Sequence, residues 1–229
     1  MEKRLKAILI LLISCTFAIT VKAQEAPYKF DFGGALGMSG YLGDANTSSI
    51  LKHPGFTADL SARYIMNTRW AFKAMLGLQS LKGNSAEMSN VTPDMKTYEF
   101  SAAVYDFGLR AEFNFFAYGI GENYKRLSRI SPYLTLGIGA CVSSSDGQTT
   151  FAPTLPMGFG VKYKLKPRVN LALEFTMTKT FSDKIDGPYL NDLTGIKTSF
   201  VKNTDWYSRL TIGITYEFGE RCETCHYVD

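Results

Sequence analysis

The sequence predicts an all-β fold: an eight-stranded antiparallel transmembrane β-barrel with short periplasmic turns and longer extracellular loops. Three observations lead to this prediction. Between Tyr28 and Gly219, about eight segments carry apolar side chains at every second position, and each is long enough to cross a membrane as a tilted strand. The connections between these segments alternate in length, and aromatic residues gather at one end of them.

The segment from Asp106 to Phe115 shows the alternation most clearly. Apolar residues stand at every second position from Phe107 onward, and Arg110 and Glu112 stand between them. Successive side chains of a strand point to opposite faces, so the two sets meet different media. In an outer-membrane barrel, lipid contacts the apolar set and the lumen holds the charges. An exported soluble β-sandwich would reverse this arrangement, and it is the main alternative fold.

The same alternation defines the eight predicted strands in chain order. They are residues 28–42, 56–66, 70–80, 98–116, 133–142, 155–165, 169–181 and 206–218. Apolar faces are formed by Phe30, Phe32, Leu36 and Met38 in the first strand, by Phe56, Leu60 and Tyr64 in the second, by Trp70, Phe72, Leu76 and Leu78 in the third, and by Leu134, Leu136 and Ile138 in the fifth. The small residues Gly137, Gly139, Gly158 and Gly160 are expected to face the lumen.

The connections distinguish the two ends of the barrel. Residues 67–69 and 166–168 are tight turns, whereas the connections at the other end reach about ten to twenty residues, as outer-membrane barrels require. We therefore expect the short turns and both termini to lie in the periplasm. The exception is the long periplasmic connection 117–131, which carries Lys125, Arg126 and Arg129 and is too long to be only a turn.

Aromatic residues support this orientation, because barrels concentrate them at the membrane interfaces. The predicted periplasmic strand ends carry Tyr28, Phe30, Tyr64, Trp70, Phe72, Phe113, Phe115, Tyr163, Tyr216 and Phe218. A soluble sandwich has no reason to build such a girdle.

The first residues are typical of an export signal. Lys3, Arg4 and Lys6 precede an apolar run, and Val21-Lys22-Ala23 forms a small-x-small cleavage site. A lipoprotein signal ending at Cys15 is the alternative. The predicted organisation is a signal peptide over residues 1–23, an outer-membrane barrel over 24–219 and a periplasmic cysteine-containing tail over 220–229.

Composition excludes two classes of protein. Removal of the signal, with its four basic residues and one acidic residue, lowers the formal charge from +4 to about +1. The remaining sequence shows no basic face that would indicate nucleic-acid binding. After the signal, no apolar run approaches the roughly 18 residues of a helical span. Strands are then the only route into the bilayer.

Eight strands enclose an interior just wide enough for side chains to fill. The charges predicted to face this lumen have both signs: Asp59, Arg63, Lys73, Asp106, Arg110, Glu112, Lys162, Lys164, Glu174, Arg209 and Glu217. We expect a paired polar core that plugs the barrel, with a narrow ion pathway as the alternative.

The sequence predicts no enzyme, cofactor or metal site. A lipid hydrolase would need a nucleophile beside a base, and the two histidines, His53 and His226, have no strand-borne Ser or Asp at a suggestive spacing. Asp183, Asp186 and Asn191 could offer oxygen ligands to calcium, but they lack the spacing of a known calcium loop and are interpreted as a solvated loop.

Cys222-Glu223-Thr224-Cys225-His226 is the sharpest local motif. Its form is that of c-type haem attachment, but only three residues follow the histidine, and zinc would need further ligands. A thiol pair in the oxidising periplasm is expected to form a disulfide, either internally or with a partner's cysteine. Cys141 lies within a predicted strand and is expected to be a buried small residue.

Several stretches, in their order and spacing, resemble the PorG family, small outer-membrane barrels of the type IX secretion system in Bacteroidetes. They are residues 40–46, the hairpin 63–72, residues 105–108 and 112–116, the segment 156–181 with its Gly-Val-Lys-Tyr-Lys core, residues 202–208, and the closing Phe218-Gly219 with its cysteine tail.

The resemblance implies a non-enzymatic outer-membrane protein that associates with the periplasmic PorK and PorN ring and has no small-molecule substrate. It suggests a periplasmic contact through Cys222, Cys225, Lys125, Arg126 and Arg129. The competing class is a stand-alone surface barrel of the OmpA or OmpX kind, which would bind ligands through its extracellular loops.

Overall fold

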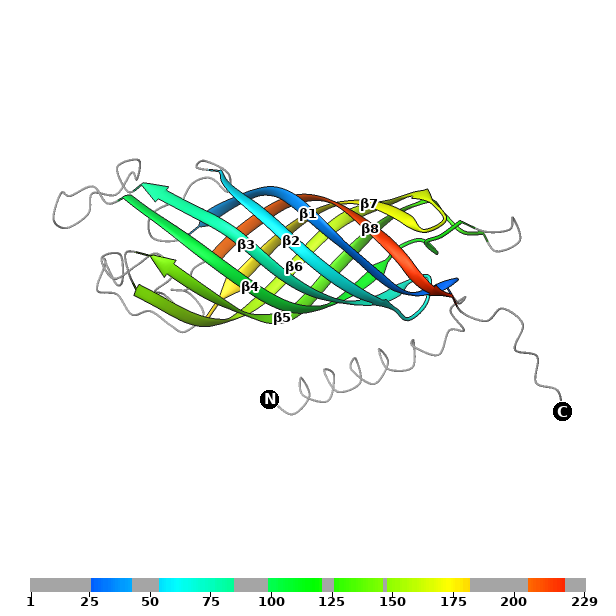
Figure 1. The fold of residues 1–229 in the computed structure, drawn as a ribbon, viewed down its shortest axis with the longest axis horizontal. Coiled ribbons are helices and arrows are strands. Elements are labelled where there is room, and N and C mark those ends of the chain that lie inside the picture. Colours follow the sequence, from blue (N-terminus) through cyan, green and yellow to red (C-terminus); the bar gives the residue numbers. More distant parts are fainter. Residues whose placement is uncertain are drawn as a thin grey trace, which may run out of the picture.

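A computed structural model of the chain describes residues 26–42, 54–84, 99–120, 126–145, 148–181 and 206–220, which form a closed barrel (Figure 1). The eight antiparallel strands are β1 (Tyr28–Leu42), β2 (Gly55–Ile65), β3 (Trp70–Asn84), β4 (Glu99–Asn114), β5 (Ile130–Ser145), β6 (Gln148–Lys166), β7 (Val169–Thr180) and β8 (Trp206–Glu220). Each strand pairs with the next, and β8 pairs with β1 to close the barrel. The predicted fold class is confirmed. None of the described residues belongs to a helix that is long and apolar enough to span a membrane.

The predicted connection between the fifth and sixth strands is wrong. β5 continues to Ser145 and β6 begins at Gln148, so two residues replace the expected long loop. The extra residues are paired, for example Ser143 with Thr150. They are mostly serine and threonine, and a pattern search based on apolar alternation does not detect a polar ladder that continues the hairpin.

The outer wall of the barrel is an apolar belt to which all eight strands contribute. Phe32 of β1, Leu76 of β3 and Ile138 of β5 are 54%, 60% and 68% exposed. A soluble monomer rarely exposes apolar patches larger than a few hundred Å², and this wall is continuous around the molecule. The interior, in contrast, holds the charged side chains. The arrangement is that of a barrel in lipid, apolar outside and polar inside.

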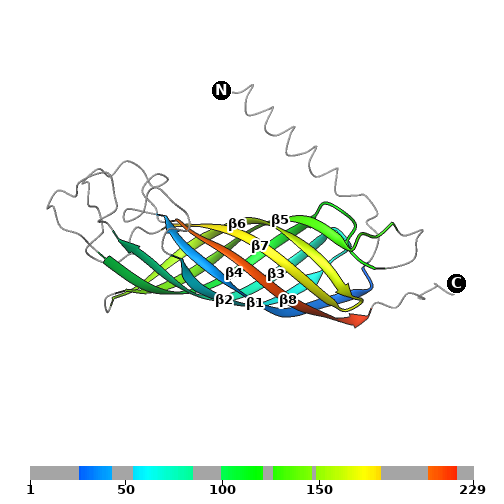
Figure 2. The ribbon, with the colours of Figure 1, turned by 90° about the horizontal axis from the view of Figure 1, so that it is seen from above.

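β1 begins and β8 ends at the same end of the barrel, where the turns after β2 and β6 also lie (Figures 1 and 2). The predicted aromatic girdle lies here. Phe30 contacts Tyr64 and Phe218, with ring centroids 5.6 and 5.7 Å apart. The ring centroids of Trp70 and Phe113 lie 4.9 Å apart. We refer to this end as the periplasmic rim, following the orientation expected from the sequence.

Candidate functional site

Among the described residues, the lumen contains six cations and six carboxylates that form ion pairs with one another. The cations are Arg63, Lys73, Arg110, Lys162, Lys164 and Arg209, and the carboxylates are Asp31, Asp59, Asp106, Glu112, Glu174 and Glu217. All eleven charges predicted to face the lumen are in these pairs. The twelfth, Asp31, stands on the polar face of β1.

Glu112 is the hub on the periplasmic side of the lumen. Its side chain is 0% exposed and forms ion pairs with three cations. Arg63 Nε lies 2.8 Å from Oε2, Lys73 Nζ lies 3.1 Å from Oε1, and Lys162 Nζ also contacts Oε2. A carboxylate buried this completely is tolerated only when it is paired and hydrogen-bonded.

The contacts next to this hub join β1, β2, β6, β7 and β8. Arg63 Nη1 donates to Asp31 at 2.7 Å, and Lys164 Nζ donates to Glu217 at 2.6 Å. The amide of Asn170 bridges the two carboxylates, donating to Glu217 at 2.9 Å and to Asp31 at 3.2 Å. Each carboxylate thus belongs to a wider network, not to an isolated pair.

Glu174 is a second hub, deeper in the barrel. It accepts Lys73 Nζ at 2.6 Å, Arg110 Nη1 at 3.1 Å and the Tyr133 hydroxyl at 2.6 Å. Lys73 therefore bridges the two hubs, since it also contacts Glu112.

Arg209 completes the network on the side away from the rim. Its Nη1 lies 3.0 Å from Asp59 and its Nη2 lies 3.5 Å from Asp106, which also accepts the Tyr207 hydroxyl at 3.0 Å. Gly77 makes room for this pair, because a Cβ there would lie 2.6 Å from Asp59 Oδ1 and 2.8 Å from Arg209 Nη1. Only glycine fits at this position without displacing the ion pair.

These contacts make the lumen a packed polar core. At its periplasmic mouth a cavity of about 20 Å³ is bounded by Asp31, Arg63, Tyr118 and Lys162. That volume holds about one water molecule. The paired core expected from the sequence is therefore observed.

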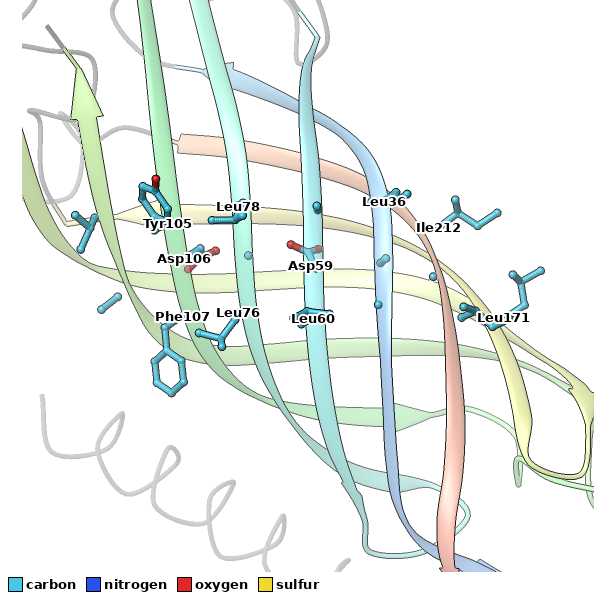
Figure 3. Close-up of a pocket in the computed structure, with 18 of the residues that line it drawn as sticks. Leu36, Asp59, Leu60, Leu76, Leu78, Tyr105, Asp106, Phe107, Leu171 and Ile212 are labelled. Carbon is cyan, nitrogen blue, oxygen red and sulfur yellow. The ribbon is translucent and has the colours of Figure 1, made fainter.

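Two large concavities formed by the described residues lie on the wall. One of about 1160 Å³ is lined mainly by apolar side chains that include Leu36, Leu60 and Leu76 on β1, β2 and β3 (Figure 3). These leucines are 57%, 56% and 60% exposed, so they face outward. In a bilayer, acyl chains would fill such spaces.

The connection between β4 and β5 forms a structure of its own, which we call the periplasmic arm (residues 115–120 and 126–129). Its two limbs are joined by hydrogen bonds from Gly119 N–H to the Ser128 carbonyl at 3.0 Å and from Ser128 N–H to the Ala117 carbonyl at 2.7 Å. Arg69 of the neighbouring turn donates to the Phe115 carbonyl at 2.8 Å. The expectation that this connection is more than a turn is confirmed for its described residues.

Tyr118 fixes the arm to the mouth of the barrel. Its backbone N–H donates to the Thr68 carbonyl at 3.1 Å, and its buried hydroxyl donates to Asn170 Oδ1 at 2.8 Å. Lys164 Nζ lies 5.2 Å from the centre of the Tyr118 ring. Burial, and to a lesser extent the nearby Glu217 carboxylate, raises the pKa of the Tyr118 phenol well above its usual range. The hydroxyl therefore stays protonated and remains a donor.

Arg126 and Arg129 are exposed on the arm, and no described residue forms an ion pair with either of them. Arg126 has a φ of 44°, in the left-handed region that residues other than glycine seldom adopt. The remaining predicted contact residues, Lys125, Cys222 and Cys225, lie outside the described residues.

Other candidate residues from the sequence have different outcomes. Cys141 is buried in β5, as expected. His53, His226, the loop with Asp183, Asp186 and Asn191, the extracellular loops and the export signal lie outside the described residues. Among the residues that are described, no group of three His, Cys, Asp or Glu side chains could hold a metal ion.

Sequence reasoning missed the polar side chains that complete the network: Tyr118, Tyr133, Asn170 and Tyr207. Strand parity could have found three of them. Tyr133 shares a face with Gly137, Asn170 with Glu174 and Tyr207 with Arg209, so all three point inward. Tyr118 follows the end of β4, where no alternation indicates its direction.

The family model described as "Domain of unknown function (DUF6089)" matches residues 3–227. No curated protein matches the chain. Among solved structures, Neisserial surface protein A is similar, with 18% identity, coverage of 84% of this chain and 98% of that chain, and a TM-score of 0.49.

Two further structures are similar at 14% identity. A major outer membrane protein from Thermus thermophilus has a TM-score of 0.48, with coverage of 84% of this chain and 100% of that chain. Ail, the attachment invasion locus protein of Yersinia pestis, has a TM-score of 0.44, with coverage of 85% and 100%. At these identities the likeness concerns the fold alone.

Proposed function

This chain belongs to the family described as "Domain of unknown function (DUF6089)", and we propose that it is a non-enzymatic outer-membrane component of the type IX protein secretion machinery. In this proposal the barrel sits in the outer membrane and its periplasmic rim associates with the ring proteins PorK and PorN. Two observations support the proposal: the PorG-like stretches of the sequence and the structure of the periplasmic rim.

The closed lumen supports a role outside transport and catalysis. The described charges of the lumen form ion pairs with one another, and the cavity at the mouth has room for about one water molecule. A catalytic nucleophile would need an adjacent base and access to substrate, and charges held in these ion pairs are poorly placed to act as that base. The surfaces of the barrel are then the parts that can act.

The periplasmic arm is the observation that carries the proposal. Outer-membrane barrels join their strands with short periplasmic turns, as residues 67–69 and 167–168 do here. The β4–β5 connection is longer, has its own backbone hydrogen bonds and is anchored by a buried tyrosine. Closing the hairpin does not require such a structure, and a rigid projection of this kind suits contact with a periplasmic partner.

The cysteine tail would supply a second contact in this proposal. β8 ends at Glu220 on the periplasmic rim, so Cys222 and Cys225 follow within a few residues. A disulfide between them would close only a four-residue loop and stabilise the barrel little. A disulfide to a partner's cysteine would instead hold the tail to the ring in an oxidising compartment. Lys125, Arg126 and Arg129 would contribute the charged part of the contact.

Affinity purification of the tagged protein from gently solubilised outer membranes tests the proposal. We expect PorK and PorN to be recovered, in part as a band on non-reducing gels that collapses on reduction. A lone band near the mature mass under both conditions would contradict the proposal and favour the stand-alone surface barrel. If a Cys222→Ser/Cys225→Ser double variant still recovers the ring, only the proposed contact through the tail is disproved.

A further inference from the structure

We propose that the exposed cations of the periplasmic rim form a docking site for a carboxylate-rich surface of a periplasmic protein. The inference rests on the proposed function and specifies the chemistry of its contact. In this inference the arm recognises acidic side chains of the partner, and Tyr118 positions the arm.

Five exposed basic side chains of the rim have no counterion among the described residues. They are Lys29, Arg69, Arg126, Arg129 and Lys166. The one exposed acidic residue in the described part of the rim is Glu220, which forms an ion pair with Arg168. The rim therefore carries an excess of positive charge that its described residues do not neutralise.

The arm presents its arginines on a rigid support. Tyr118 is only 9% exposed and holds one limb to the barrel mouth, while the Gly119–Ser128 hydrogen bonding holds the second limb to the first. Figures 1 and 2 show the described part of the β4–β5 connection extending past the strand ends on the side where β1 begins and β8 ends. Preorganised groups lose less entropy on binding than groups on a free loop.

Arg126 retains a charge at a costly backbone position. Its φ of 44° is adopted readily by glycine and rarely by side-chain-bearing residues. Local strain of this kind often accompanies a functional position. No described residue forms a hydrogen bond or ion pair with the side chain that would compensate for the strain, which points to a contact outside the chain.

A protein surface fits these groups better than lipid phosphates do. The girdle aromatics Phe30, Tyr64 and Trp70 mark the membrane interface on the strands. Arg126 lies on the arm beyond the strand ends, and the arm is held against the mouth by an inward-pointing tyrosine. Arginine also forms bidentate hydrogen bonds with carboxylates, which gives such a contact geometric specificity.

The test uses the full-length tagged protein and three forms of it: the wild type, an Arg126→Gly/Arg129→Gln double variant, and Arg168→Gln. Glycine readily adopts the left-handed backbone at position 126, so this substitution should leave the conformation of the arm in place. Arg168→Gln is the matched control, because it removes a cation from the same rim that already has a carboxylate partner. Recovery of PorK and PorN is measured across a salt series.

We expect the double variant to recover the ring about tenfold less than the wild type, and Arg168→Gln to match the wild type. Wild-type recovery should also fall as salt rises, because screening shortens the reach of exposed charges. Equal recovery by all three forms would overturn the docking site and leave the proposed function standing.

Two other outcomes would also overturn the inference. A double variant that keeps the ring but loses binding to vesicles of anionic phospholipid would assign the cations to lipid. A wild type that recovers no ring protein at any salt concentration would overturn the proposed function and the docking site with it.

Discussion

The lumen and the periplasmic rim use the same kinds of cation in opposite ways. In the lumen, Arg63 and Arg110 are buried and each contacts a carboxylate within 3.1 Å. On the rim, Arg126 and Arg129 are exposed and no described residue forms an ion pair with them. The difference separates charges that hold the fold from charges that are available to a partner.

This difference has a physical origin. A buried ion must be paired, because the penalty for removing it from water amounts to several kcal/mol. An exposed ion remains solvated, so nothing in the fold requires it to have a counterion. Lumen substitutions should therefore change stability, and rim substitutions should change association.

The largest expected effect comes from breaking the lumen hub. Glu112→Gln leaves Arg63, Lys73 and Lys162 without their shared carboxylate, and should lower the free energy of unfolding by about 3–5 kcal/mol. Denaturant unfolding of the barrel in detergent micelles measures it. Glu220→Gln is the matched control: its pair with Arg168 is exposed, and its loss should cost at most about 1 kcal/mol. Equal losses in the two variants would contradict the distinction.

A charge placed on the lipid face should have the next largest effect. Leu76→Arg places a guanidinium on the outer wall of β3 and should cost about 2–4 kcal/mol if that position lies near the bilayer midplane. Phe116→Arg, at the rim, should cost only about 0–1 kcal/mol. Unfolding in lipid vesicles measures both. A barrel that tolerates both substitutions equally would not span a bilayer with Leu76 at depth and Phe116 at an interface.

Loss of the arm's anchor should have a smaller effect. Tyr118→Phe keeps the ring but removes the hydrogen bond to Asn170, and should lower stability by about 1 kcal/mol. Tyr118→Ala also removes the ring from the mouth, so planar-bilayer recordings should detect more frequent conductance events than in the phenylalanine variant. Identical traces for the two variants would show that the charged network alone seals the lumen.

The smallest expected effect on stability comes from the rim arginines. Arg129→Gln should change the free energy of unfolding by no more than about 0.5 kcal/mol, as is usual for exposed positions without fixed partners. Arg126→Gly should fall in the same range, because relief of the left-handed backbone offsets the greater freedom of glycine in the unfolded chain. A loss above about 2 kcal/mol in either variant would place that arginine among the structural charges.

Much of the barrel follows from residue parity alone. The alternation around Arg110 and Glu112 identifies β4 and the direction in which its side chains point, because a strand has a period of two. The same rule places Asp31 and Tyr133 in the lumen. Polar strand extensions such as Ser143 to Ser145 escape it, because the apolar set that defines the period is missing there.

The contacts themselves could not be predicted. Lys73 and Glu174 are separated by 101 residues and lie on β3 and β7, on different sides of the barrel. Their meeting depends on strand tilt, stagger and closure together. The fold of the arm depends on hydrogen bonds between irregular segments, and no periodic pattern encodes such bonds. The docking role proposed for Arg126 rests on its backbone angle and on the absence of a described counterion, and neither property is encoded in a sequence pattern.

The most direct test asks whether lumen charges serve stability and rim charges serve binding. It measures both the stability and the recovery of the ring for Glu112→Gln and for the Arg126→Gly/Arg129→Gln double variant. We predict that Glu112→Gln lowers stability while its folded fraction still recovers PorK and PorN. The double variant should keep wild-type stability and lose recovery. A double variant that unfolds more easily, or a Glu112→Gln barrel that is fully stable, would contradict the assignment of paired charges to the fold and exposed rim charges to the partner.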